Sequence, residues 1–259
     1  MPPNAKSKPK RSVIYLINPI FTQFASDIFT IVATGYGDPT WGDNPAITKE
    51  MLPATLETLA ISAISGVFAV LLGIPLGLFC VATSKDGLIP NVVVNKITGF
   101  IIDLGRSIPF LILAVFLTPL TRLVVGTTVG WQASSIPLII GATPFFARLV
   151  ESNIMGVDKG KIEAAQMMGA SRTQIMWGVQ VREALPALMQ STTVLVITII
   201  GYTAITGSLG GGGLGAMAIN YGRFRWQSDT MIVSIVVIGV IVMAVQYLGD
   251  FLTHRVDHR

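Results

Sequence analysis

Few residues in this chain have the types and the spacing that catalysis or metal binding requires. Its two histidines, His254 and His258, are spaced like a metal-binding pair on a helix, but no third ligand is in view. Its single cysteine, Cys80, allows neither an intrachain disulfide nor a multi-cysteine metal site. No serine–histidine–acid or cysteine–histidine arrangement can be built, and no Gly-x-x-x-x-Gly-Lys-Ser/Thr loop occurs. We therefore expect a non-catalytic chain that holds no metal or cofactor and does not itself hydrolyse ATP.

The residues best arranged for an interaction lie in the polar stretch 157–188, VDKGKIEAAQMMGASRTQIMWGVQVREALPAL. Asp158 can cap a short helix, because its carboxylate accepts from free backbone N–H groups and is favoured by the helix dipole. Gly169 can adopt the left-handed conformation that ends this helix. Ser171 and Gln174 have the spacing of a capping box, which begins a second helix. The stretch therefore predicts an exposed short helix–turn–helix, with a solvated amphipathic loop as the alternative.

Within this stretch, Glu163-Ala164-Ala165-x-x-x-Gly169 resembles the signature loop of binding-protein-dependent ABC importer permeases. In that family the loop forms the coupling helix, which docks into a groove on an ATPase subunit. The resemblance implies a partner ATPase that binds ATP and Mg²⁺. Four residues take the coupling role by this resemblance: Glu163, Ala164, Ala165 and Gly169.

The chain departs from the family pattern further on. Where the family continues with Ile-x-Leu-Pro, this chain has Val179-Gln180-Val181-Arg182, and the proline is lost. Pro186 follows shortly afterwards. We therefore expect Pro186 to set the bend into the next apolar segment.

The resemblance runs from about Met51 to Arg255, and several segments are similar to the methionine-importer permeases. Those segments are Arg106–Phe110, Gly141–Phe145, Glu183–Pro186, and Gly201–Tyr202 with Gly210–Gly215. The resemblance implies a homodimer, two ATPase subunits, an extracytoplasmic substrate-binding protein, and D- or L-methionine and close analogues as cargo. An importer for another amino acid or small solute is the alternative. A stand-alone secondary transporter is another, although the sequence shows neither inverted repeats nor paired half-helices.

A glycine segment and a row of hydroxyl side chains each have both a structural and a functional interpretation. The segment Gly210–Gly215 contains Gly-x-Gly-x-x-Gly but follows an apolar run rather than a strand, which excludes a dinucleotide site. Its glycines form either a flexible outer turn or a tight loop that closes an outer gate between subunits: Gly210, Gly212, Gly213 and Gly215. Farther back, four hydroxyl side chains share a helix face: Ser191, Thr198, Tyr202 and Thr206. They either bond to their own helix or, for Thr198, Tyr202 and Thr206, line the translocation path.

The composition indicates that the elements carrying these residues lie in a membrane. Hydrophobic residues make up 51% of the chain and charged residues only 12%, with a mean hydropathy of +0.66, whereas a soluble domain carries roughly 25% charge. The apolar residues form runs of about 20, the length of a membrane-spanning helix, without the strict alternation of barrel strands. The net charge of +4 is small and scattered, which favours lipid headgroups over nucleic acid as a partner. We therefore predict an all-α integral membrane protein.

Five core transmembrane helices follow from the apolar runs: Leu56–Ala82, Ile97–Leu120, Ser134–Met155, Leu188–Leu209 and Thr230–Leu252. They form a permease domain over residues 51–255, with residues 156–187 as a cytoplasmic coupling loop. Residues 1–50 are an N-terminal extension. Its segment Val13–Ala33 has apolar and polar faces at helical spacing, so it either lies in the membrane interface or forms a sixth span.

Charge asymmetry orients these spans in the cytoplasmic (inner) membrane. With the loop at 156–187 in the cytoplasm, most basic residues lie inside: Lys85, Lys96, Arg106, Arg148, Lys159, Lys161, Arg172, Arg182, Arg255 and Arg259. Outside are Lys49, Arg122, Arg223 and Arg225, and the remaining four basic residues join the inside only if Val13–Ala33 crosses the membrane: Lys6, Lys8, Lys10 and Arg11. The positive-inside rule therefore predicts a cytoplasmic loop and C-terminus. Two ionisable pairs, Asp103 with Arg106 and Arg148 with Glu151, are spaced one turn apart and are expected to neutralise each other.

Overall fold

The computed structural model describes Gln23, Ser26 and residues 43–256. Of the segment Val13–Ala33 it describes only those two residues, so the question of a sixth span lies outside the described part. Within residues 43–256 the chain forms helices and no strand. The helices are η2 (Ala46–Glu50), α2 (Met51–Thr83), α3 (Val92–Ser107), α4 (Phe110–Phe116), α5 (Thr118–Val125), α6 (Trp131–Met155), α7 (Lys159–Met167), α8 (Arg172–Gln174), η3 (Ile175–Gln180), α9 (Val181–Ser208), α10 (Gly213–Met217), η4 (Ala218–Phe224) and α11 (Ser228–Val256).

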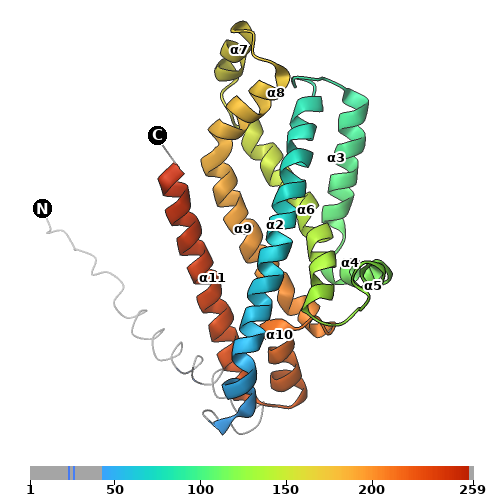
Figure 1. The fold of residues 1–259 in the computed structure, drawn as a ribbon, viewed down its shortest axis with the longest axis vertical. Coiled ribbons are helices and arrows are strands. Elements are labelled where there is room, and N and C mark those ends of the chain that lie inside the picture. Colours follow the sequence, from blue (N-terminus) through green and yellow to red (C-terminus); the bar gives the residue numbers. More distant parts are fainter. Residues whose placement is uncertain (1–22, 24–25, 27–42, 257–259) are drawn as a thin grey trace, which may run out of the picture.

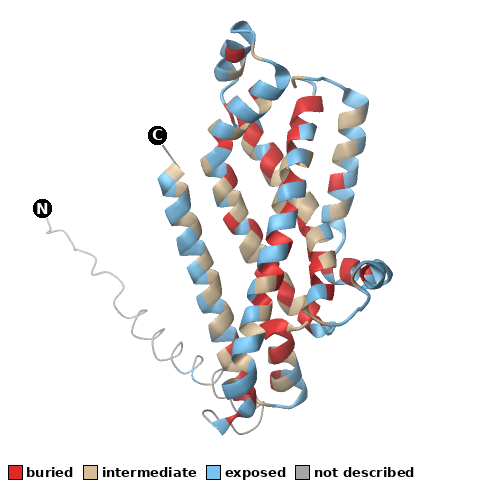
Figure 2. Cartoon of the chain, viewed as in Figure 1, coloured by how far each residue is buried: buried red, intermediate tan, exposed pale blue. Residues whose placement is uncertain are grey.

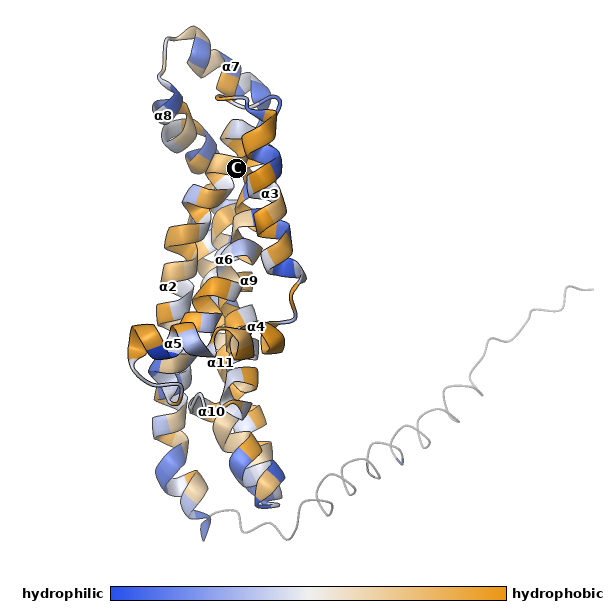
Figure 3. Cartoon of the chain, turned by 90° about the vertical axis from the view of Figure 1, so that its right-hand side faces the viewer, coloured by the Kyte–Doolittle hydropathy of each residue, from blue (hydrophilic) through white to orange (hydrophobic). Residues whose placement is uncertain are grey.

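Four of the five predicted spans are continuous helices in the bundle of Figure 1. α2, α6, α9 and α11 are each long and apolar enough to cross a membrane. The bent pair α3 and α4 makes a fifth if it is counted as one span. Hydrophobic residues cover the middle of the bundle, and polar ones gather toward α7 and α8 (Figure 3). The predicted all-α membrane fold is confirmed for the described residues.

The second predicted span, Ile97–Leu120, is wrong as a single helix. α3 ends at Ser107, and α4 leaves it at an angle of 100°. Pro109 causes the break, since it lacks a backbone N–H and forces the residue before it out of the helical region. Accordingly, Ile108 is extended, with φ −78° and ψ 124°. Arg106 therefore lies at the break, far along α3 from Val92, whereas the charge count grouped it with the basic residues of the loop at 156–187.

The core lies where α2, α6 and α9 pack together. Gly73 and Gly77 let α2 approach α6 closely, because a Cβ on either would stand 2.7 Å from Phe146 or from Ala147 and Val150. α11 packs mainly on α9, and only 6% of its most apolar stretch is buried within the chain, as its blue and tan surface in Figure 2 shows.

Candidate functional site

The polar stretch 157–188 begins with the predicted helix–turn–helix, at one end of the bundle (Figure 1). Asp158 Oδ1 accepts the N–H of Gly160 at 2.8 Å and so caps α7. Gly169 ends the helix with φ +78°. The N–H groups of Gly169 and Ala170 bond back to the carbonyls of Gln166 and Ala165, at 3.0 and 3.1 Å, which is the Schellman arrangement. Each of these bonds joins residues within five positions of one another, so the shape of α7 is encoded locally.

The second half of the stretch begins as predicted and then differs. Ser171 and Gln174 form the capping box, with N···O distances of 2.8 and 3.3 Å. α8 then widens into the π-helical turn η3 and continues without interruption into α9. Pro186 lies inside α9 and ends no helix. The apolar segment therefore starts through a widened helical turn, and a bend at Pro186 stays a prediction.

The predicted coupling residues occupy different faces of α7. Glu163, Ala164 and Gly169 are exposed, whereas Ala165 is buried because α7 packs on η3. Only one of the two small side chains therefore faces outward. Sequence reasoning missed Met167 and Met168, which are 90% and 81% exposed. Flexible, polarisable methionines suit a surface that must fit a partner.

α7 contacts the spans beneath it through η3 and one ion pair. Lys161 forms an ion pair with Glu183 at the start of α9. Under the hairpin, Ile154 and Ile175 are almost fully buried. Asn153 on α6 donates to Ser191 Oγ on α9 at 2.8 Å. α7 is therefore connected to α9 through η3 and this ion pair, and α9 is bonded in turn to α6.

Next along the bundle, one arginine joins the two predicted ion pairs into a single network. Arg148 donates to both oxygens of Asp103, at 3.0 and 2.7 Å, and also to Glu151. A further bond at 3.0 Å reaches the carbonyl of Gly99. The predicted pair Arg148–Glu151 is present, whereas Arg106 lies 3.8 Å from Asp103, whose oxygens Arg148 already occupies. The network connects α3 to α6, and sequence spacing could not reveal it because the two arginines compete for one acid.

The predicted hydroxyl face of α9 lies beside α4. Thr198 and Thr206 donate to carbonyls of their own helix, those of Val194 at 2.7 Å and Thr203 at 3.1 Å. Tyr202 stacks on Phe110 of α4, with the ring centroids 4.4 Å apart. The two threonine hydroxyls are thus accounted for by bonds within α9, and the path role stays a prediction.

Two clefts adjoin α4 and include two of these three residues. Thr206 lines a cleft of about 280 Å³ shared with α5 and the start of α6. Tyr202 lines a smaller cleft of about 140 Å³ at the break between α3 and α4. Sequence reasoning missed both clefts, although Pro109 was a signal for the break beside the smaller one.

The glycine segment folds into a tight turn within the chain at the end of the bundle opposite α7. Gly210, Gly212 and Gly213 have positive φ values of 85°, 75° and 77°. A Cβ on Gly215 would lie 2.4 Å from the Cα of Ala204, so α10 packs directly on α9. Glu57 accepts the N–H of Gly213 at 2.7 Å. These contacts account for the glycines inside one subunit, and their role as an outer gate stays a prediction.

Comparison with known proteins gives consistent results. Residues 69–259 match the family model described as "Binding-protein-dependent transport system inner membrane component". A probable D-methionine transport system permease protein MetI of Vibrio cholerae is 46% identical over 209 residues, 81% of this chain and 93% of that protein. The methionine import system permease protein MetP of Bacillus subtilis is 44% identical over 177 residues, 68% and 80% of the two chains.

Solved structures agree with these relatives. A chain from the inward-facing MetNI methionine ABC transporter superposes with a TM-score of 0.81 at 36% identity, covering 83% of this chain and all of that one. An amino acid ABC transporter solved with histidines gives a TM-score of 0.66 at 18% identity, over 81% and 95% of the chains, which indicates a shared fold.

Proposed function

Since this chain belongs to the binding-protein-dependent transport system inner membrane components, we propose that it is the membrane-spanning subunit of an ATP-driven methionine importer. The substrate is supported by relatives at 43–46% identity whose names specify D-methionine transport. It is also supported by the likeness to the MetNI methionine transporter. The permease domain of residues 51–255 functions as a homodimer, with the translocation path between the two copies and an extracytoplasmic binding protein delivering the substrate.

The observation that carries the proposal is α7, a capped helix projecting from the bundle with Glu163, Ala164, Met167 and Met168 exposed. We assign α7 to a groove on a partner ATPase, which binds ATP and Mg²⁺. Closure of two ATPase subunits on ATP would draw the two α7 helices together. Because α7 is tied to α6 and α9, this motion would reach the hydroxyl face of α9. The change requires that the two states of the importer bind ATP with different affinity.

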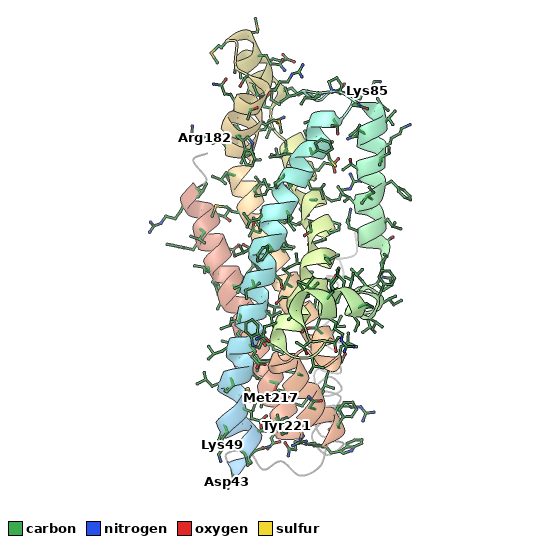
Figure 4. The ribbon with its side chains drawn as sticks, turned by 45° about the vertical axis from the view of Figure 1, so that its right-hand side comes forward. Asp43, Lys49, Lys85, Arg182, Met217 and Tyr221 are labelled. Carbon is green, nitrogen blue, oxygen red and sulfur yellow. The ribbon has the colours of Figure 1, made fainter. Side chains whose placement is uncertain are left out.

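The orientation follows from the basic residues. In Figure 4, Lys85 and Arg182 lie at the α7 end, whereas Asp43 and Lys49 lie at the opposite end. We place the α7 end and the C-terminus in the cytoplasm by the positive-inside rule. In a chain with Cys80 replaced, a cysteine at Asp43 should react with an impermeant thiol reagent in sealed cells. A cysteine at Ser171 should react only after the cells are permeabilised, and the reverse pattern would invert the topology.

The function is tested by reconstituting the chain with its proposed partners, the ATPase and the substrate-binding protein. Proteoliposomes should take up labelled methionine only when ATP is present on the α7 side. Uptake without the ATPase would indicate a stand-alone transporter. Uptake of another amino acid in preference to methionine would support the ATP-driven importer but refute methionine as its substrate.

A further inference from the structure

Arg106 lies beside a sharp break in the transmembrane bundle. It precedes the break at Ile108–Pro109, where the chain turns by 100° within a pair of helices that together could span the membrane. α3 rises about 1.5 Å per residue, so Arg106 stands roughly 20 Å along the bundle from Val92. An arginine at such a depth is costly, and it is retained in membrane proteins where it has a partner or a function.

The Arg106 guanidinium has few partners among the described residues. Among residues 43–256, the one charge that it pairs with is Asp103, at 3.8 Å, and Arg148 already donates to both oxygens of that carboxylate. Within residues 43–256 the guanidinium makes no hydrogen bond, and the side chain is 43% exposed. Most of its N–H donors are therefore available to another acceptor.

The surroundings of Arg106 are apolar and aromatic. The cleft of about 140 Å³ at the break is lined by Arg106, Ile108, Phe110, Leu113, Phe145 and Tyr202. Phe110 and Tyr202 stack with an interplanar angle of 5°, which forms a flat wall between α4 and α9. Gly105 allows this arrangement, because a Cβ there would stand 2.8 Å from Pro144 of α6. One cation thus faces a pocket whose other walls suit an apolar group.

We propose that Arg106 binds the carboxylate of the amino acid in transit, with the side chain of that amino acid against Phe110, Phe145 and Tyr202. This inference rests on the proposed function and names a subsite for it. A guanidinium matches a carboxylate with two parallel hydrogen bonds and so replaces the water that the substrate loses. A thioether makes favourable contacts with aromatic rings. Arg106 and the rings would therefore recognise the two ends of methionine.

The first test measures uptake by the complete importer, permease with ATPase and binding protein, in proteoliposomes. Arg106→Gln should lower the maximal rate of methionine uptake at least about tenfold, the effect of losing a charge-assisted hydrogen bond, while ATP hydrolysis continues. The methionine concentration for half-maximal uptake should not change, because the binding protein sets it. Arg106→Lys should recover part of the rate. Arg122→Gln is the matched control, since Arg122 is exposed on α5 and does not line this cleft.

The second test uses photo-methionine, the diazirine analogue of methionine, on the same complex. Labelling should fall on peptides that carry Phe110, Phe145 or Tyr202, should be prevented by excess methionine, and should be lost in Arg106→Gln. Normal uptake by Arg106→Gln, or labelling elsewhere in a complex that imports methionine, would overturn the subsite and leave the importer intact. Loss of complex assembly in both Arg106 variants would overturn it in favour of a contact between subunits. A native complex that imports no methionine would overturn the proposed function itself.

Discussion

The hairpin at the α7 end and the opposite end of the bundle are shaped by hydrogen bonds of different range. At the α7 end, the hydrogen bonds that shape the hairpin join residues within five positions of one another. At the opposite end, the bonds join helices far apart in the chain: Glu57 with Gly213, Thr58 with Leu214, Asn44 with Asp229, and Ser134 with Gly211. Most of these groups are buried.

This difference indicates different mechanical roles. A hairpin with internal caps keeps its shape when it is displaced, so α7 suits an element that a partner moves as a unit. The opposite end connects α2, α6, α9, α10 and α11, and it can rearrange only if several long-range bonds break together. We therefore expect substitutions there to act on stability and substitutions in the hairpin to act on coupling. Four predictions test this contrast.

The largest effect is expected where backbones touch at the end opposite α7. A side chain at Gly207 would place its Cβ 2.3 Å from the backbone nitrogen of Ala216. Gly207→Val should therefore force α10 away from α9 and cost about 3 kcal/mol or more of stability. The thermal midpoint of the purified protein in detergent measures this loss. Gly201→Val is the control on the same helix, because a Cβ at Gly201 meets nothing within 4 Å, and equal midpoints for the two variants would refute the contact.

The next effect concerns coupling and not folding. Gly169→Val forces a β-branched residue into φ +78°, at a local cost of roughly 1–2 kcal/mol, but no neighbouring atom lies in its way. The bundle should remain folded while methionine uptake per ATP hydrolysed falls about tenfold, by roughly 1.4 kcal/mol of coupling. Gly178→Val is the control, because Gly178 is helical and equally open. A variant that transports normally with its ATPase would remove α7 from the coupling role.

The range of the bonds also decides which features could be predicted from the sequence. The cap at Asp158, the left-handed Gly169 and the capping box at Ser171 depend on neighbouring residues only, and all three are present as predicted. The spans other than the second depend on long apolar runs and are also present.

The missed features depend on residues distant in the chain. Ala165 turns inward because η3 lies beneath it. Arg148, and not Arg106, forms the hydrogen bonds with Asp103 because α6 packs on α3. The break at Pro109 was visible locally, but its apolar surroundings resemble an unbroken span. A single sequence does not show which distant residue will pack against a given side chain in the folded protein.

A smaller loss of stability should follow from removing a carboxylate at the end opposite α7, but not from removing one on α7. Glu57 accepts the N–H of Gly213 at 2.7 Å, at the start of α10. Glu57→Gln keeps the shape and removes the charge, so stability should fall by about 1 kcal/mol. Glu163→Gln, an exposed carboxylate on α7, should leave the thermal midpoint unchanged. If both substitutions shifted the midpoint equally, the contrast between the two ends would not hold for charged groups.

The smallest effect concerns Tyr221, which donates to Glu50 Oε1 at 2.6 Å near the end opposite α7. The hydrogen bond to Glu50 raises the pKa of Tyr221 above its ordinary value, which is near 10. A raised folded-state pKa means that the bond stabilises the protein fully below about pH 10 and ceases to do so as pH rises through the folded-state value. Because the pair is partly exposed, its contribution should be only a few tenths of a kcal/mol.

Tyr221→Phe isolates this bond, because phenylalanine keeps a ring beneath Arg225, whose guanidinium lies 4.4 Å from the ring centroid. The variant should melt slightly below the parent protein at pH 8, and the difference should disappear at a pH above the raised value. Tyr247→Phe, exposed on α11, should show no difference at pH 8. A difference for Tyr221→Phe that persists unchanged at high pH would mean that packing of the hydroxyl, and not its bond to Glu50, joins η4 to the start of α2.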